Sequence, residues 1–257
     1  RAIDLATTLF IVASKSGGTL EVMSFFRHFH KLVADVKSKR AGENFIAITD
    51  PGTGLQKMAE ANRFRRTFFN PPDIGGRYSA LSFFGMVPAA LAGVQVAELA
   101  ARGMQMAEWC GAGVPAKENP GAVLGAALGA LAKAGRDKVT FITSPGISLF
   151  GLWAEQLIAE STGKDGKGIL PIAQEPFGPA RVYGNDRVFA YLRLDGDDNK
   201  EADRHAVALE RAGFPVLRFF LQDRSDLGAE FFRWEFSTAL AGAVIGIHPF
   251  DQPNVQE

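Results

Sequence analysis

The sequence has a single cysteine, Cys110, in 257 residues. One thiol can form neither an internal disulfide nor a metal cluster of thiolates, and its isolation fits a reducing, cytoplasmic compartment. The neighbouring Trp109 favours a packing role for this cysteine, and a nucleophilic role is the alternative.

The sequence also lacks an excess of charge of one sign and any long apolar run. Lys+Arg and Asp+Glu each number 28, so the formal net charge is zero. This balance argues against a general nucleic-acid or anionic-membrane surface, but it allows a local basic pocket. No apolar run reaches the roughly 18 residues that a membrane span needs. Gly121, Gly125 and Gly129 resemble a transmembrane packing face, but the run is short and contains Lys133, so we expect a helix packed closely on a sheet.

Motifs for cofactors and metals are missing as well. There is no glycine-rich dinucleotide fingerprint, and no eightfold βα pattern of the kind that forms a barrel around a Schiff-base lysine. The four histidines do not have the spacing of a metal site, and no second cysteine could serve as a ligand. The sequence therefore predicts neither a nucleotide cofactor nor a metal ion.

What the sequence does contain is a regular alternation of two patterns. Short apolar runs bounded by Gly, Ser, Asn and Asp predict strands, and segments with apolar residues at helical spacing predict helices. The predicted strands comprise residues 8–14, 45–49, 66–70, 138–144, 168–173, 188–194 and 215–221. The predicted helices comprise residues 19–37, 55–62, 80–91, 94–109, 121–134, 147–161, 202–212 and 227–246. Such alternation predicts an α/β fold with mainly parallel sheets in a three-layer αβα sandwich.

The alternation pauses between Gly111 and Pro120, where prolines, glycines and charges are concentrated. We place a domain boundary there, with a first domain over residues 1–115 and a second domain over residues 116–257. The chain begins at Arg1 without methionine, and a strand follows almost at once. We expect the chain to be a piece of a longer protein, with its first domain truncated at the N-terminus.

The turn after the first predicted strand is a candidate phosphate site. Its residues are Ser14-Lys-Ser-Gly-Gly-Thr19, and Thr19 is a natural N-cap for the helix that follows. Backbone N–H groups, hydroxyls and the Lys15 ammonium then surround the positive end of a helix, where phosphate binds well. Many strand-to-helix turns bind nothing, so an ordinary turn is the alternative.

A carboxylate near the end of a later helix is a candidate acid–base group. Gln156 and Glu160 lie four residues apart on one helical face, and Gly163 is a plausible C-cap. Glu160 then lies in the last turn, where the helix dipole disfavours the ionised carboxylate. A proton-transfer enzyme needs a group of this kind, although an ordinary exposed glutamate would produce the same pattern.

Two further residues are candidates because of their positions. Arg77 follows two glycines at the mouth of a loop, where it could clamp an anion or stabilise the loop. His205 opens a helix after a strand and a loop, which is a crevice position in a parallel sheet.

Four motifs in order along the chain resemble one family. Ser14-Lys-Ser-Gly-Gly-Thr-Leu-Glu21 resembles the sugar-phosphate loop of sugar isomerase (SIS) domains, and Gly75-Gly-Arg-Tyr-Ser79 is similar to a signature of glucose-6-phosphate isomerases. Glu160-Ser-Thr-Gly-Lys164 resembles the segment of that family that contains the catalytic base. Gly246-Ile-His-Pro-Phe-Asp-Gln-Pro-Asn254 resembles its C-terminal motif. The linking sequence looks most like the isomerase part of bacterial bifunctional transaldolase/glucose-6-phosphate isomerases.

The resemblance implies two SIS-type domains with the active site in the crevice between them. It also implies interconversion of glucose 6-phosphate and fructose 6-phosphate, as in glycolysis and gluconeogenesis, by proton transfer through a cis-enediol without a cofactor. A homodimer and a fused transaldolase domain are further implications. A non-catalytic sugar-phosphate sensor is the rival hypothesis, because it would keep the phosphate turn and need no base.

The resemblance also assigns roles to individual residues. Glu160 would move the proton, Arg77 would stabilise the enediolate, and His205 would open the sugar ring. The residues implied in binding the phosphate or the sugar hydroxyls are Ser14, Lys15, Ser16, Thr19, Gln156 and Gln252.

The chain departs from the family pattern in several places. The family's Gly-Gly-Ser phosphate turn would precede residue 1, and its lysine after the Phe-Asp-Gln motif would follow Glu257. The family's ring-opening histidine lies in a Gly-Gln-His context, whereas His205 lies in Asp-Arg-His-Ala and matches only by its strand–loop–helix setting. We therefore expect that a chain with these bounds could bind a sugar phosphate without full activity.

Overall fold

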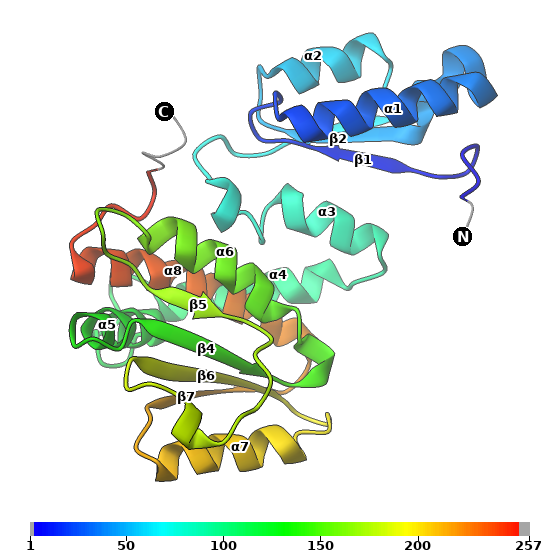
Figure 1. Ribbon diagram of the computed structural model, residues 1–257. Helices are drawn as coiled ribbons and strands as arrows, with labels where there is room; N and C mark the ends of the chain where they lie inside the picture. The colour runs from blue at the N-terminus through cyan, green and yellow to red at the C-terminus, as the bar shows by residue number, and fades with distance from the viewer. Residues whose placement is uncertain (1–2, 252–257) are drawn as a thin grey trace. The chain divides into compact units, whose positions relative to one another are not determined.

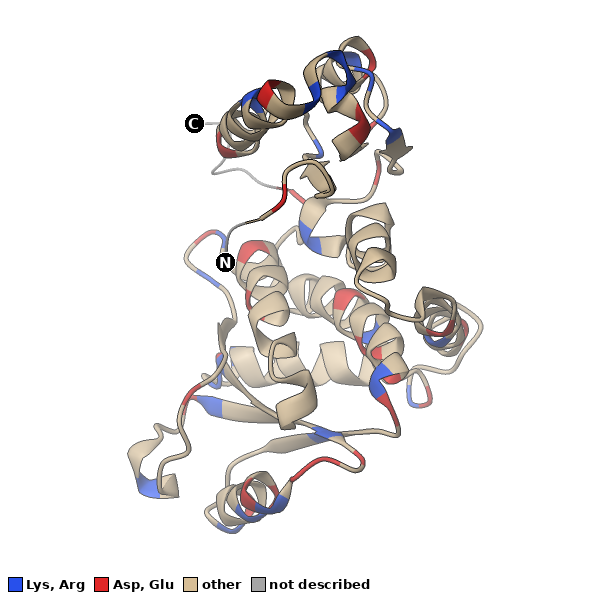
Figure 2. Ribbon diagram, turned by 90° about the vertical axis from the view of Figure 1, so that its right-hand side faces the viewer, with Lys and Arg blue, Asp and Glu red and all other residues tan. Residues whose placement is uncertain are grey.

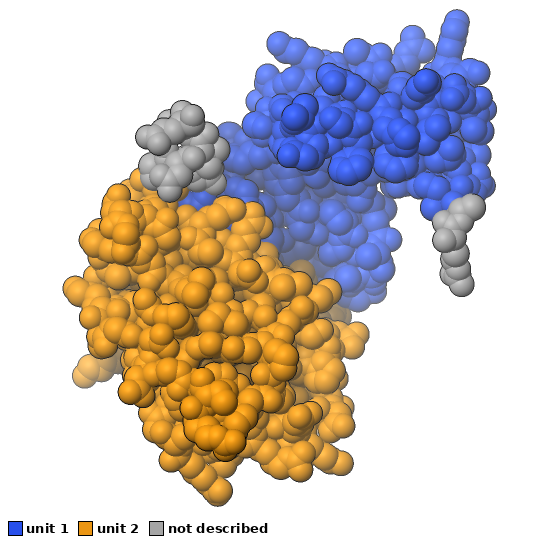
Figure 3. Space-filling model, in the orientation of Figure 1, with its two compact units in different colours: residues 1–96 blue, residues 97–257 orange. Residues whose placement is uncertain are grey.

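The computed structural model describes residues 3–251, and its internal contacts divide the chain into two compact units, residues 1–96 and 97–257 (Figure 3). Each unit contains a parallel sheet with helices (Figure 1). The predicted fold class, α/β with parallel sheets, is therefore confirmed. Lys and Arg are interspersed with Asp and Glu along the described elements (Figure 2).

The first unit has three parallel strands in the order β1-β2-β3. They are β1 (Phe10–Ala13), β2 (Phe45–Thr49) and β3 (Arg66–Phe69). Every residue of the central strand β2 is buried. A strand covered on both faces needs a continuous apolar sequence, and Phe-Ile-Ala-Ile supplies it.

Two helices cover one face of this sheet, α1 (Leu20–Lys37) and α2 (Gly54–Ala61). The apolar stripe of α1 places Phe26 in the core, where its ring meets that of Phe45 edge-on at 5.6 Å. Thr53 caps α2 by accepting a hydrogen bond from the Gln56 backbone N–H. The helical spacing in the sequence thus places the apolar face of α1 against the sheet.

Further helices complete the first unit. A short 3-10 helix, η1 (Ser38–Asn44), follows α1 and was not predicted. Helix α3 (Phe83–Leu91) starts after Ser82, whose hydroxyl accepts from the Phe84 N–H. The ring of Phe83 lies 5.7 Å from the ring of Phe68 on β3, which attaches α3 to the sheet.

The second unit has four parallel strands in the order β5-β4-β6-β7. The strands are β4 (Lys138–Thr143), β5 (Leu170–Ile172), β6 (Arg187–Leu194) and β7 (Val216–Leu221). The helices are α4 (Val96–Trp109), α5 (Pro120–Lys133), α6 (Phe150–Thr162), α7 (Lys200–Arg211) and α8 (Leu227–Ile245). Helices α6 and α8 lie on one face of the sheet and α7 lies on the other (Figure 1).

The alternation of side chains along β4 explains this sandwich. Phe141 points to one face, where its ring lies 5.0 Å from that of Trp234 on α8. The next residue, Ile142, joins the opposite core cluster with Ala206 and Leu209 of α7. Successive strand residues point to opposite faces, so one apolar strand serves two cores.

The glycines of α5 allow close packing on a helix, whereas the sequence predicted packing on a sheet. A Cβ added at Gly121, Gly125 or Gly129 would lie 2.6–2.7 Å from the nearest atom of Phe236, Ser237 or Val244, respectively. Those three residues belong to α8. The four-residue spacing therefore marks a helix–helix contact, and among the described residues no helix is long and apolar enough to cross a membrane.

The compact units meet at residue 96, before the predicted boundary at 115/116. The contacts of α4 explain the difference. The Arg102 guanidinium lies 3.3 Å from Asp226, and a Cβ at Gly228 would collide with the Leu99 carbonyl oxygen. Helix α4 is therefore part of the second unit, and residues 111–119 form a loop inside it.

Candidate functional site

In the first unit, the turn from β1 to α1 contains the predicted phosphate-binding residues. Ser14 is buried at the end of β1, and its backbone N–H bonds to the Ile48 carbonyl oxygen of β2 at 3.0 Å. Its hydroxyl accepts from the Gly17 N–H at 3.2 Å and lies 2.9 Å from the Thr19 hydroxyl. The hydroxyls of Ser14 and Thr19 thus close the turn across the start of α1.

Gly17 makes this turn possible. Its φ is 69°, and a Cβ there would lie 2.7 Å from Thr53 Cβ and 2.8 Å from the Leu55 backbone nitrogen. Only glycine adopts such a left-handed conformation at little cost, and no side chain would fit against α2. The glycine at position 17 is therefore a requirement of the turn itself.

The first turn of α1 faces this loop with unused donors. The first helix-internal bond runs from the Met23 N–H to the Thr19 carbonyl oxygen, so the N–H groups of Leu20, Glu21 and Val22 have no partner within the helix. Thr19 is the N-cap as predicted, but its hydroxyl does not cap α1. An 18-residue helix directs a partial positive charge at this end, which suits a phosphate group.

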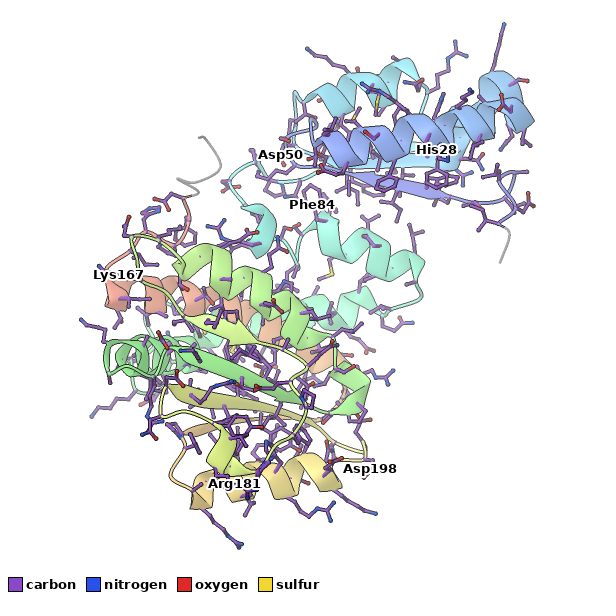
Figure 4. All side chains as sticks on the ribbon, viewed as in Figure 1. His28, Asp50, Phe84, Lys167, Arg181 and Asp198 are labelled. Atoms are coloured by element: carbon purple, nitrogen blue, oxygen red, sulfur yellow. The ribbon has the colours of Figure 1, made fainter. Side chains whose placement is uncertain are left out.

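Lys15 is held by its neighbours within the unit. Its ammonium forms an ion pair with Asp50 and donates to the Pro72 carbonyl oxygen at 2.8 Å. Asp50 follows β2, and Pro72 follows β3. Lys15 thus joins the carboxyl ends of three strands, and Asp50, labelled in Figure 4, balances its charge. Sequence reasoning missed Asp50, whose only signal was its place directly after a predicted strand.

Arg77 lies in the 3-10 helix η2 (Gly76–Tyr78) and is 4% exposed. Its guanidinium lies 5.5 Å from the Tyr78 ring centroid. The Ser79 hydroxyl closes the turn by donating to the Gly76 carbonyl oxygen at 2.5 Å. The motif Gly75–Ser79 therefore holds a buried cation on a tightly bonded turn, which goes beyond the exposed loop arginine of the alternative interpretation.

In the second unit, Gln156 and Glu160 lie on an exposed face of α6, as their spacing predicts. The Gln156 side-chain amide donates to Glu160 Oε1 at 3.1 Å. Gly163 is the C-cap, and its N–H bonds to the Ala159 carbonyl oxygen at 2.9 Å. Glu160 therefore lies in the last turn of the helix, where a carboxylate opposes the dipole.

Lys164 follows this helix and was not among the predicted site residues. It is 6% exposed, and its ammonium binds the backbone oxygens of His248 and Asp251 and the Asp251 carboxylate. The motif that contains Glu160 is thereby joined to the segment that follows α8. The only sign of Lys164 in the sequence was its position at the end of the motif that contains Glu160.

His205 lies on α7 among aromatic rings. Its ring stacks on Phe177 at 4.5 Å and meets Tyr183 and Phe189 edge-on at 6.0 and 6.5 Å. Burial lowers the pKa of His205, which favours the neutral ring. Helix α7 and helix α6 lie on opposite faces of the sheet, so this unit does not bring His205 beside Glu160 (Figure 1). Its role in ring opening stays a prediction.

Ser16, Gln252 and Cys110 are the other residues that the sequence singles out. The Ser16 hydroxyl accepts from the Gly18 N–H at 3.4 Å, within the phosphate turn. Gln252 lies outside the described residues. Cys110 is buried, and burial raises the pKa of its thiol, which confirms the packing interpretation. Among residues 3–251, no three His, Cys, Asp or Glu side chains are grouped to hold a metal ion.

Solved structures with the same fold define the class of protein. A hypothetical protein of Thermus thermophilus matches 99% of this chain with a TM-score of 0.87 at 23% identity, and the match covers 70% of that protein. A glucose-6-phosphate isomerase from Chlamydia trachomatis matches 99% with a TM-score of 0.76 at 22% identity, over 58% of its own length. A glucosamine-6-phosphate deaminase from Thermotoga maritima matches with a TM-score of 0.56 at 13% identity, over 99% of this chain and 75% of that one. The chain therefore shares its fold with solved structures that include an isomerase and a deaminase of sugar phosphates.

Curated relatives narrow this class. A glucose-6-phosphate isomerase of Rubrobacter xylanophilus is 31% identical over 95% of this chain and 65% of its own length. A second, from Parabacteroides distasonis, is 28% identical over 95% of this chain and 63% of its own length. The chain is thus a homologue of glucose-6-phosphate isomerases and spans a little under two thirds of their length. No family model matches it.

Proposed function

We propose that the protein is an aldose–ketose isomerase that interconverts glucose 6-phosphate and fructose 6-phosphate. The observation that carries the proposal is the Gln156–Glu160 pair in the last turn of α6, at the position of the base in the family motif. Relatives named for this reaction match 95% of the chain, which supports the assignment. Proton transfer between neighbouring carbons needs such a carboxylate and no cofactor.

The first unit is assigned the binding of the phosphate group. The hydroxyls of Ser14, Ser16 and Thr19 and the N–H groups that begin α1 supply donors for phosphate oxygens. Lys15 braces the loop by its ion pair with Asp50. A phosphate bound here fixes one end of the sugar and leaves the carbonyl end for reaction.

The second unit is assigned the chemistry. Glu160 removes the proton from C2 of the open-chain aldose and returns it to C1, so that a cis-enediol separates the two sugars. The amide of Gln156, which donates to Glu160 Oε1, orients the carboxylate and contacts the sugar hydroxyls. Arg77, a residue of the first unit, is assigned to stabilise the charge that develops on the enediolate oxygen. Gln252 contacts the hydroxyls, and His205 is assigned to ring opening.

We also infer a place and a setting for the protein. The single cysteine favours the reducing cytoplasm, where glycolysis and gluconeogenesis take place. A homodimer and a fused transaldolase domain remain parts of the proposal that rest on the family resemblance alone.

A coupled assay for fructose 6-phosphate conversion tests the proposal. Glu160→Gln should lower kcat by roughly 10²–10⁴-fold with little change in KM, because general base catalysis contributes about that much. Glu155→Gln is the matched control, since Glu155 is exposed on the same helix and has no assigned role. Parental activity in Glu160→Gln would remove Glu160 as the base. Binding of the sugar phosphate without conversion by the unsubstituted protein would favour the sensor hypothesis.

A further inference from the structure

The end of α6 and the segment from Gly246 to Asp251 meet around one buried ammonium group. Lys164 is 6% exposed, and its Nζ donates to the His248 carbonyl oxygen at 2.5 Å. It also donates to the Asp251 carbonyl oxygen at 2.7 Å and to Asp251 Oδ1 at 2.5 Å. An ammonium carries three donors, and here each donor meets an oxygen of the segment.

A tight turn fixes Lys164 at this place. The backbone groups of Lys164 and Lys167 exchange two hydrogen bonds, at 3.1 and 2.9 Å. Asp165 and Gly166 between them have φ values of 53° and 68°, the pattern of a type I′ turn. Because the turn begins directly after the C-cap Gly163, the backbone of Lys164 is held rigidly at the end of α6.

The segment itself is folded onto the end of α8. Gly246 ends that helix in the left-handed conformation, with φ 79°, and the Ile247 N–H bonds to the Gly242 carbonyl oxygen at 3.0 Å. Pro249 packs so closely on Gly242 that a Cβ there would lie 3.0 Å from Pro249 Cβ. The contacts of Lys164 then fix the far end of the segment, at Asp251.

The sequence places two assigned residues directly beside this contact. Glu160 lies one helical turn before Lys164 on the same helix end, and Gln252 is the residue that follows Asp251. We propose that Lys164 is a positioning residue that anchors the segment from Gly246 to Asp251 to the end of the helix carrying the base. The inference rests on the proposed function for its catalytic consequence, whereas the anchoring itself is independent of it.

Burying the charge of Lys164 is energetically costly, so we do not expect this contact to serve only to hold two segments together. A buried charge is tolerated only when it is paired and fully hydrogen-bonded, and its removal leaves the oxygens around it without donors. Lys167, three residues further on, contacts the Gly246 carbonyl oxygen at 3.4 Å and is exposed. Figure 4 shows Lys167 beside the end of α8. It has the same side chain and the same neighbourhood but makes one long contact, so it is a matched control.

The experiment compares Lys164→Met and Lys167→Met with the unsubstituted protein by two measurements. Hydrogen exchange of the backbone amides of Ile247, His248, Phe250 and Asp251 reports the anchoring, and we expect at least tenfold faster exchange in Lys164→Met alone. The coupled assay reports the catalytic consequence. In Lys164→Met, kcat should fall at least tenfold, while the inhibition constant of inorganic phosphate should stay within twofold because the phosphate turn belongs to the first unit. General unfolding would change both quantities.

Each other outcome has a definite meaning. Unchanged exchange in Lys164→Met contradicts the anchoring, and faster exchange with an unchanged kcat contradicts the positioning role. Equal effects of both substitutions would also contradict it, because Lys167 makes none of the buried contacts. If the unsubstituted protein does not isomerise the sugar phosphate, the proposed function fails and the positioning role falls with it. The exchange measurement then still decides whether Lys164 anchors the segment.

Discussion

The two units each have a turn from a strand to a helix that begins with a buried serine, but they use it differently. Ser14 follows β1 and Ser144 follows β4, and each donates its backbone N–H to the neighbouring strand, to Ile48 and Leu192 respectively. In the first unit the Ser14 hydroxyl serves only its own loop, through Gly17 and Thr19. The two turns therefore share the backbone hydrogen bond of the serine and differ in the partners of its hydroxyl.

In the second unit, other groups of the protein form hydrogen bonds with the polar groups of the turn. Ser144 donates to the Asn199 side chain at 2.5 Å and accepts from the Leu194 N–H at 2.7 Å. Asp197 Oδ2 accepts from the Gly146 N–H at 2.7 Å, at the place where an anion would bind. In the described part of the chain, the Gly17 and Gly18 N–H groups of the first unit meet hydroxyls and no carboxylate. The comparison shows that a carboxylate binds a backbone N–H group in the second turn, whereas in the first turn the nearby Asp50 carboxylate binds Lys15 and the Gly17 and Gly18 N–H groups meet hydroxyls.

The second unit also contains a buried carboxylic acid, Glu230, that should make the stability of this unit depend on pH. Glu230 on α8 is 4% exposed, and its Oε2 has no hydrogen-bond partner among residues 3–251. Burial raises the pKa of Glu230 from 4.5 to about 7, with Arg233 opposing the shift only in part. The folded state therefore binds a proton that the unfolded state has released between pH 4.5 and 7. Stability is full below pH 4.5 and declines as pH rises through 7, by roughly 3 kcal/mol.

Urea unfolding at pH 5 and pH 8 measures this effect. All three tryptophans, Trp109, Trp153 and Trp234, belong to residues 97–257, so their fluorescence follows the second unit. Glu230→Gln should remove the decline, whereas the exposed control Glu155→Gln should retain it. A decline that persists in Glu230→Gln would show that another group is responsible.

The turn that follows β1 in the first unit should be sensitive to a single methyl group. Gly17→Ala places a Cβ 2.7 Å from Thr53 Cβ on a backbone with φ 69°. We expect a loss of about 1–2 kcal/mol of stability from the strained conformation and an increase of roughly tenfold in KM for the sugar phosphate. Gly52→Ala is the control for the conformation alone, because Gly52 has φ 81° and no atom within 4 Å of the added Cβ. An equal rise in KM for both variants would contradict the phosphate assignment.

A substitution in the turn that follows β4 should lower the stability of the second unit and leave the binding of the sugar phosphate unchanged. Asp197→Ala removes the acceptor of the Gly146 N–H and should cost about 1 kcal/mol in tryptophan-detected unfolding. Asp198→Ala is the control, since Asp198 is exposed and labelled at the rim of the unit in Figure 4. KM for the sugar phosphate should not change. A raised KM in Asp197→Ala would break the distinction between the two turns.

Local pattern predicted the elements and the turn, because both depend on neighbouring residues. Strand β2 has its predicted bounds, Phe45–Thr49, and β1, α1 and α6 begin within a few residues of the prediction. The turn after β1 could be found because Gly17 is needed for its conformation, whereas its role in phosphate binding stays a prediction. The exposed pair of Gln156 and Glu160 could be found because four residues span one helical turn.

Long-range pairs could not be predicted from those patterns. Lys15 meets Asp50 across 35 residues, Gly146 meets Asp197 across 51, and Lys164 meets Asp251 across 87. Each pair depends on which strands and helices become neighbours, which the periodicity of a segment does not encode. The same cause hid the packing of α5 on α8 and the membership of α4 in the second unit. His205 was selected by its place after a strand, and only the fold revealed its aromatic surroundings.

Exchange of protons between substrate and solvent tests the central assignment most directly. The unsubstituted protein is incubated with fructose 6-phosphate in D₂O, and NMR follows the loss of one C1 proton. A base at Glu160 predicts deuterium incorporation at C1 by the unsubstituted protein and by Glu155→Gln. It predicts incorporation at least a hundredfold slower in Glu160→Gln. Incorporation at the parental rate in Glu160→Gln would contradict the assignment of this carboxylate as the group that moves the proton.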